Sequence, residues 1–141
     1  MMKSIPVWKQ ELSDGVHAAR LASLYCCSPA ETASEAARYT AVLDGLEKTF
    51  GSHAEAGLYS APGRTEIGGN HTDHQHGRVL AGSVNIDMIA AAAPNDKNQL
   101  RVQSEGYDLC VIDLNDLEAR KEEENTTAAL LRGECAAFTQ R

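Results

Sequence analysis

The chain has 141 residues, with 20 Asp and Glu against 13 Lys and Arg, and a formal net charge of −7. This length is typical of one domain, or part of one, with a modest core. The acidic balance and the lack of any Lys or Arg run argue against nucleic acid and anionic membranes as partners and favour a small neutral or polar ligand. We expect a cytoplasmic protein, because no stretch approaches the ~20 apolar residues of a membrane span and residues 1–7 lack a signal-peptide core.

The cysteines do not follow a ligand or bridge pattern. They stand at positions 26, 27, 110 and 135, which is not zinc-knuckle spacing, and the chain has no secretory signal. We therefore expect reduced packing residues rather than disulfides or metal ligands.

The first fifty residues carry helical patterns. Ser28, Pro29 and Glu31 together are typical of a capping box with Pro at the first helical position. A helix is predicted over 29–50, with Gly51 as its left-handed cap. The residues that recur at helical spacing are Ala36, Thr40, Leu43, Leu46 and Phe50. Residues 15–25 are partly periodic and predict a preceding helix.

After Gly51 the pattern changes to that of strands. Residues 54–60 are expected to form a loop, or a short strand entering one, and a polar loop follows over 60–77. Apolar or alternating segments over 86–93, 100–104 and 109–114 predict three strands that meander antiparallel through hairpin-length turns. A helical pattern returns over 126–138. The predicted fold class is α+β, with a helical part (1–50), the loop, and strands with a terminal helix (78–141).

The 60–77 loop holds the densest cluster of functional side chains, interleaved with glycines. Such a loop is costly to order without a purpose, but its polar residues could also merely satisfy turns. A metal site is a second interpretation, because His71, Asp73, His74 and His76 are ligand types within six positions. The metal signal is weak, because Asp73 precedes the second histidine and alternate residues of an extended loop point in different directions.

Sugar recognition is the third interpretation. A carboxylate such as that of Asp73 accepts paired hydrogen bonds from hydroxyls, and glycines permit close backbone approach. Arg64 has a fixed charge and many donors, so it suits the negative charge of a transferring phosphoryl group better than it suits a sugar.

The residues "SAPGRTEIGGNHTDHQHG", followed by "VLAGSVNIDMIAAA", resemble the signature segment of galactokinases. There, Pro-Gly-Arg leads through glycines to Glu-His-x-Asp-Tyr and then to an apolar strand. The resemblance covers 60–93 and implies the amino-terminal α+β domain of a small-molecule kinase family that also includes mevalonate and homoserine kinases. In that family the sugar binds between two domains.

The resemblance assigns roles by position. Arg64 resembles the arginine near the reacting sugar hydroxyl, while His71 and Asp73 match residues that hold sugar hydroxyls. Asn70 stands where the usual pattern has Glu, so an acceptor is kept without its charge. His74 replaces the usual Tyr and Glu66 replaces the usual Asn, which marks a divergent subgroup. His74 and His76 are expected to shape the loop, as are the glycines at 68, 69 and 77.

The resemblance also implies what the 141 residues lack. Related kinases cradle ATP phosphates in a Pro-x-x-x-Gly-Leu-Ser-Ser-Ser loop, and no such segment occurs in this sequence. We expect ATP and Mg²⁺ to serve the full-length protein, no tightly bound cofactor in this chain, and no phosphorylation of galactose by the chain alone. A truncated gene product or a deliberately shortened chain is the expected origin. A non-catalytic sugar-binding or regulatory relative is the alternative.

A last expectation concerns self-association. Strands of an incomplete sheet leave unpaired backbone groups, and an apolar face made of Ile86, Met88 and Ile89 would be uncovered. The chain is therefore expected to bind copies of itself as well as galactose or a related monosaccharide.

Overall fold

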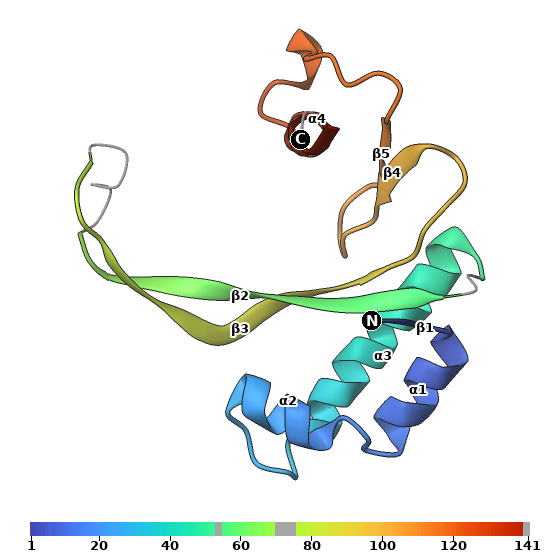
Figure 1. Cartoon of the computed structure of the whole chain (residues 1–141), viewed down its shortest axis with the longest axis vertical. Helices are drawn as coiled ribbons and strands as arrows, with labels where there is room; N and C mark the ends of the chain where they lie inside the picture. The colour runs from blue at the N-terminus through green and yellow to red at the C-terminus, as the bar shows by residue number, and fades with distance from the viewer. Residues whose placement is uncertain (53–54, 70–75, 140–141) are drawn as a thin grey trace. The chain divides into compact units, whose positions relative to one another are not determined.

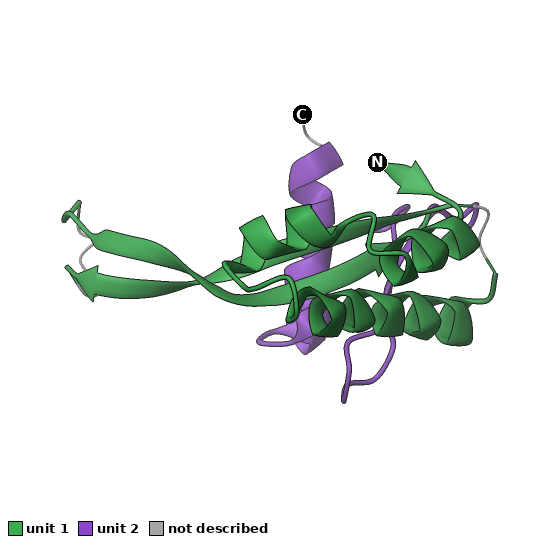
Figure 2. Cartoon of the chain, turned by 90° about the horizontal axis from the view of Figure 1, so that it is seen from below, with its two compact units in different colours: residues 1–93 green, residues 94–141 purple. Residues whose placement is uncertain are grey.

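The computed structural model describes residues 1–52, 55–69 and 76–139. It divides into two compact units, residues 1–93 and 94–141, which are described separately (Figure 2). Unit 1 contains β1 (Met2–Lys3), α1 (Ile5–Ser13), α2 (Ala18–Tyr25), α3 (Thr32–Phe50), β2 (Ala56–Gly68) and β3 (Leu80–Ala92). Unit 2 contains β4 (Gln99–Val102), β5 (Cys110–Asp113), the 3-10 helix η2 (Lys121–Glu123) and α4 (Thr127–Thr139). The predicted α+β class is confirmed, with helices first and antiparallel strands after them.

The helix α3 is the predicted long helix, but it begins three residues later than expected. The Glu31 carboxylate accepts hydrogen bonds from the Ser28 amide and hydroxyl, each at 2.7 Å, so this pair closes a turn before the helix. Gly51 follows the last helical residue with φ +85°, a conformation that costs glycine little.

The helix predicted over 15–25 is confirmed as α2, whereas α1 was not predicted. Its signal was present in the sequence, because Pro6 stands in the first turn and Ile5, Trp8 and Leu12 recur at helical spacing. All three are buried, so α1 contributes directly to the core.

The core of unit 1 lies between the helices and one face of the β2–β3 hairpin (Figure 1). Leu43 of α3 is fully buried, and Leu58, Ile89 and Ala91 of the hairpin pack against the cluster around it. The indole Nε1 of Trp8 donates to the carbonyl oxygen of Ala56 at 2.8 Å, which ties α1 to the start of β2. Burial of apolar area on this one face supplies the main driving force for unit 1.

The β2–β3 hairpin is longer than the sequence predicted. Residues 60–68 of the expected loop belong to β2, and they pair with β3 as far as Gly68 opposite Leu80. Pairing satisfies the backbone groups of a segment whose composition alone does not favour a strand. The expected three-strand meander is also wrong in part, because the described sheet order is β1-β2-β3, with β4 and β5 forming a separate antiparallel pair.

A bulge divides the hairpin into two parts. Pro62 lies opposite Asp87 and Arg64 lies opposite Ser83, so residues 84–86 oppose the single residue Gly63. A Cβ added to Gly63 would lie 3.1 Å from the Ile86 carbonyl oxygen, so the strands approach closely at this point. We call residues 64–68 and 80–83 the distal arm, because they lie beyond the bulge and away from the helices (Figure 1).

The two faces of the hairpin next to the helices differ in burial. Ile89 packs against the core, so its predicted place on an uncovered face is wrong. Ile86 and Met88 are 77% and 78% exposed, as the expected apolar face requires. Self-association through this surface stays a prediction.

A buried carboxylate joins the helices to the hairpin next to the bulge, on the side of the helices. The side chain of Asp87 is 3% exposed and accepts from Tyr25 Oη of α2 at 2.5 Å, from Ser60 Oγ of β2 at 2.6 Å and from Arg38 Nη2 of α3 at 2.8 Å. Burial alone would raise the pKa of Asp87, but the hydrogen bonds from Ser60, Tyr25 and Arg38 outweigh it and hold that pKa below its ordinary value. Asp87 is therefore an ionised group held by donors from three elements.

Tyr39 extends this network by one hydroxyl. Its Oη lies 2.8 Å from Tyr25 Oη, and because Tyr25 gives its own proton to Asp87, Tyr39 is the donor in that pair. Burial, followed by the hydrogen bond to Asp87, raises the pKa of Tyr25. The Tyr25 hydroxyl thus stays a neutral donor over the whole neutral range.

Unit 2 has a small framework of its own. The pair β4–β5 runs from Gln99 opposite Asp113 to Val102 opposite Cys110, and Ile112 is fully buried. Arg132 of α4 is 4% exposed and is held by Glu123 at 2.6 and 2.8 Å and by the Asp116 carbonyl oxygen at 2.6 Å. The helix predicted over 126–138 is confirmed as α4.

The lowered pKa of Asp87 predicts a specific acid dependence. We expect Asp87→Asn to lower the free energy of unfolding by about 1.5–3 kcal/mol at pH 7, because hydrogen bonds to a charged group are lost. A depressed pKa contributes stability above the unfolded-state pKa and loses it as pH falls through the folded-state value, so the difference from the parent should shrink below about pH 4.

Urea unfolding of parent and variant between pH 7 and pH 2.5 measures this difference. Asp44→Asn on α3 is the control, because its carboxylate is 62% exposed and an exposed pair with Lys9 is worth about 1 kcal/mol or less. A difference for Asp87→Asn that stays constant down to pH 2.5 would show that its ionisation is not what stabilises the fold.

Candidate functional site

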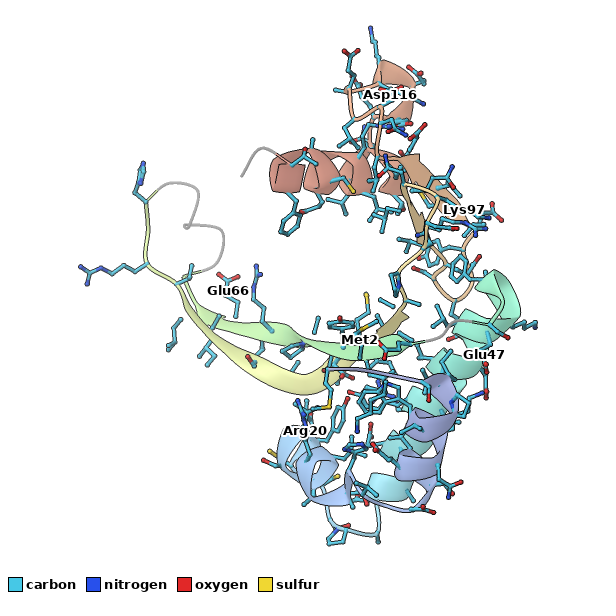
Figure 3. The ribbon with its side chains drawn as sticks, turned by 45° about the vertical axis from the view of Figure 1, so that its right-hand side comes forward. Met2, Arg20, Glu47, Glu66, Lys97 and Asp116 are labelled. Carbon is cyan, nitrogen blue, oxygen red and sulfur yellow. The ribbon has the colours of Figure 1, made fainter. Side chains whose placement is uncertain are left out.

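The candidate site lies on the distal arm, which carries the first predicted site residue. Arg64 stands on β2 opposite Ser83, and its side chain is exposed. Side chains alternate along a strand, so Arg64 and Glu66 occupy the same face of the arm. Figure 3 shows Glu66 standing clear of the α1–α3 layer. The strand thus presents a positively charged guanidinium, with five hydrogen-bond donors, to solvent and to any ligand that approaches this face.

Gly69 is the last described residue after β2. Its φ is +88°, and a Cβ at this position would lie 2.2 Å from the Arg78 carbonyl oxygen and 2.8 Å from Val79 Cα. The chain can therefore pass this point only without a side chain. Gly68 has no such constraint, because an added Cβ there meets nothing within 4 Å. Of these two neighbouring glycines, only Gly69 has the conformational role that the sequence predicted.

His76 is the first described residue before β3. It is exposed and has φ +60°, which is uncommon for a residue other than glycine. This left-handed backbone agrees with the expectation that His76 shapes the loop.

The remaining predicted site residues cannot be placed. Asn70, His71, Asp73 and His74 lie outside the described residues. The structure therefore brings Arg64, Glu66, Gly69 and His76 to one end of the hairpin and gives no geometry for the predicted sugar contacts.

Several other expectations concern metals, cysteines and membranes. Within the described ranges, no three His, Cys, Asp or Glu side chains gather as a metal site would require. The cysteines are all free thiols; Cys26 is exposed, and those at 27, 110 and 135 are partly buried. No helix among the described residues is long and apolar enough to cross a membrane.

Unit 2 contains a hollow of about 530 Å³ between η2 and α4. Arg120, Lys121 and Arg132 line it, but the Arg132 guanidinium is already engaged by Glu123 and the Asp116 carbonyl oxygen. This hollow contains none of the residues that the sequence singled out, and we assign it no function.

The sequence alone did not predict the buried Asp87 network at the base of the arm. Asp87 is an acidic residue inside the apolar run 86–93, and a charge in such a position signals a buried, partnered group. Its partners Tyr25 and Arg38 are 62 and 49 positions away along the chain, so no local pattern could have identified them.

Comparison with known proteins identifies the segment that carries the arm. Residues 46–94 match the family described as the galactokinase galactose-binding signature. This range contains the end of α3 and the whole β2–β3 hairpin, including Arg64 and Gly69. The resemblance to galactokinases that the sequence predicted is therefore confirmed for this segment.

Curated relatives extend the resemblance over about half of the chain. A galactokinase of Ligilactobacillus salivarius (strain UCC118) is 35% identical over 83 residues, which are 57% of this chain and 21% of the relative. Galactokinases of Lacticaseibacillus casei and Streptococcus suis (strain 05ZYH33) are each 34% identical over 48% of this chain, and the aligned parts are 17% and 18% of those relatives. The chain thus spans about a fifth of the length of the curated relatives it matches. No solved structure matches it.

The contrast between Gly68 and Gly69 gives a prediction with a built-in control. Gly69→Ala should lower the free energy of unfolding by about 2 kcal/mol or more, because a left-handed conformation and a clash with Arg78 combine. Gly68→Ala should change it by no more than about 0.5 kcal/mol. Urea unfolding of both variants is the measurement. Equal effects at the two positions would mean that the turn does not depend on the close approach at Gly69.

Proposed function

We propose that this chain is the galactose-recognition part of a kinase that transfers the γ-phosphoryl group of ATP to galactose, giving galactose 1-phosphate. The observation that carries the proposal is the match of residues 46–94 to a galactose-binding signature, on a hairpin whose distal arm exposes Arg64. The relatives that the chain resembles are named galactokinases, which is the activity proposed here.

The residues of the signature would divide the work between sugar and phosphoryl group. Asp73 and His71 would take paired hydrogen bonds from sugar hydroxyls, and Asn70 would add a neutral acceptor. Arg64 would stabilise negative charge on the transferring group, because its guanidinium is always protonated and forms paired hydrogen bonds to phosphoryl oxygens. This assignment rests on the resemblance and, for Arg64, on its exposed place on the arm.

The 141 residues contain no Gly-Ser phosphate loop of the kind that the related kinases use for ATP. We therefore derive no step through Mg²⁺ and propose that ATP is bound by parts of the protein beyond these 141 residues. Phosphoryl transfer depends on positioning and charge stabilisation, so the chain alone is proposed to be inactive.

A non-catalytic sugar-binding relative would use the same hairpin without transferring phosphate. Asn70 and His74 stand where galactokinases usually have Glu and Tyr, and this departure favours the non-catalytic alternative. Turnover of a joined protein, in which this chain precedes the remaining four-fifths of a galactokinase, separates the two functions.

Sugar binding tests the recognition role. In the joined protein, Asp73→Asn should weaken galactose binding by about 1.5–3 kcal/mol, the scale of hydrogen bonds to a charged acceptor. Isothermal calorimetry measures the affinity directly. Glu55→Gln, an exposed position before β2, is the control and should bind like the parent. Unchanged galactose affinity in Asp73→Asn together with loss of a bound metal would replace sugar recognition by metal binding.

Turnover tests the role of Arg64. Arg64→Ala in the joined protein should lower kcat by about 10²-fold or more and change KM much less, because the guanidinium acts on charge that develops in the transition state. Arg101→Ala on β4, outside the matched segment, is the comparison variant. A kcat equal to the parent's would remove Arg64 from the catalytic residues, and galactose-dependent ATP turnover by the 141-residue chain alone would contradict its proposed inactivity.

A further inference from the structure

The distal arm leaves the helical layer at a single well-built junction. Asp87 directly follows the bulged residues 84–86 on β3, on the side of the helices, and its carboxylate joins α2, α3 and β2 through Tyr25, Arg38 and Ser60. Asn85 is the middle residue of the bulge, and its Nδ2 donates to the Tyr25 carbonyl oxygen at 3.4 Å. The side chains of Asp87 and Asn85 thus bond the hydroxyl and the main-chain carbonyl of Tyr25, the last residue of α2.

The described arm has no comparable attachment beyond this junction. The hydrogen bonds that tie the described hairpin to the helices are those of Ala56, Asn85 and Asp87, and all of these residues lie outside the arm, on the side of the helices. The described residues of both arm strands are mostly exposed, including Ile67 at 68% and Leu80 at 62%. The direction of the arm is therefore set where the bulge begins.

The junction acts on Arg64 through distance. Pro62 lies opposite Asp87, and Arg64 is two residues further along β2, about 7 Å at ~3.3 Å per residue. A rotation of about 10° at the junction would move Arg64 by about 1 Å, and a misplacement of ~1 Å can cost ~10²-fold in a phosphoryl transfer that depends on positioning. The geometry of the junction is thus within the range that decides catalysis.

We propose that Asp87 is a positioning residue, which fixes the direction of the distal arm and thereby the place of Arg64. The catalytic part of this inference rests on the proposed function, whereas the structural part does not. Asp87 contacts neither the sugar nor the phosphoryl group in this role. It acts because its three donors come from three different elements, so the carboxylate can be satisfied only when helices and hairpin keep one relative orientation.

Residual dipolar couplings of the 141-residue chain test the structural part. In the parent, amides of α3 and of the arm (64–68 and 80–83) should fit one alignment tensor. In Tyr25→Phe, which removes one donor and keeps the carboxylate, and in Asp87→Asn, the arm couplings should shrink or require a second tensor. Trp8→Phe is the matched control, because it removes a buried hydrogen bond between α1 and β2 at the opposite end of the hairpin and should keep one tensor.

Loss of stability is separated from loss of position by measuring the unfolding of every variant under the same conditions. If Asp87→Asn does not fold, Tyr25→Phe decides, because it is isosteric and keeps the ion pair with Arg38. Arm couplings that still fit the α3 tensor in a folded Tyr25→Phe or Asp87→Asn would overturn the proposal. So would an equal change in Trp8→Phe, since the effect would then belong to any weakening of the layer.

Turnover in the joined protein tests the catalytic part. Asp87→Asn should lower kcat at least tenfold, change KM less than threefold, and leave galactose-dependent turnover detectable, while Trp8→Phe should stay within twofold of the parent. If the unsubstituted joined protein shows no turnover, both the proposed function and the catalytic part of this inference are wrong. The dipolar couplings would still decide whether Asp87 orients the arm. Unchanged kcat in a folded Asp87→Asn would show that Arg64 is positioned by other contacts.

Discussion

Unit 1 depends on the ionised carboxylate of Asp87, because this buried charge can be tolerated only where several donors meet. Tyr25, Ser60 and Arg38 supply those donors from α2, β2 and α3. An apolar interface of helices and sheet would tolerate sliding of one layer against the other, but a directional network does not. The apolar core around Leu43 supplies the driving force for association of the layers, and the carboxylate selects one arrangement.

The long hairpin shows how one pair of strands can serve two purposes. Before the bulge, Leu58, Ile89 and Ala91 pack against the helices and make the strands part of a core. Beyond the bulge, the arm is held mainly by its own ladder and carries polar side chains such as Arg64 and Glu66. Bulges commonly occur where a strand must redirect a side chain, and here the bulge lies between the anchored half and the half with the candidate site.

Local signals in the sequence were enough for much of the fold and for one part of the site. Periodicity predicted α2, α3 and α4, the capping signal at Ser28 placed the start of α3 three residues too early, and the alternating segments predicted β4 and β5. The extent of β2 could not be predicted, because Pro62, Gly63 and Gly68 disfavour a strand and only pairing with β3 overrides that preference. Arg64 and Gly69 followed from the motif, whereas the Asp87 network joins residues 27 to 62 positions apart and is visible only after folding.

The galactose-binding signature is therefore not a self-sufficient structural unit. Residues 46–94 contain Ser60 and Asp87, but Tyr25 and Arg38 lie before the matched range. A two-stranded hairpin is marginally stable by itself, and without those partners the Asp87 carboxylate would lose two of its three donors and much of its burial. The matched segment therefore keeps its shape only together with α2 and α3, because these helices satisfy the charge at the base of the arm. In physical terms, the far end of the hairpin can hold a fixed direction only while its near end stays attached to the helical layer.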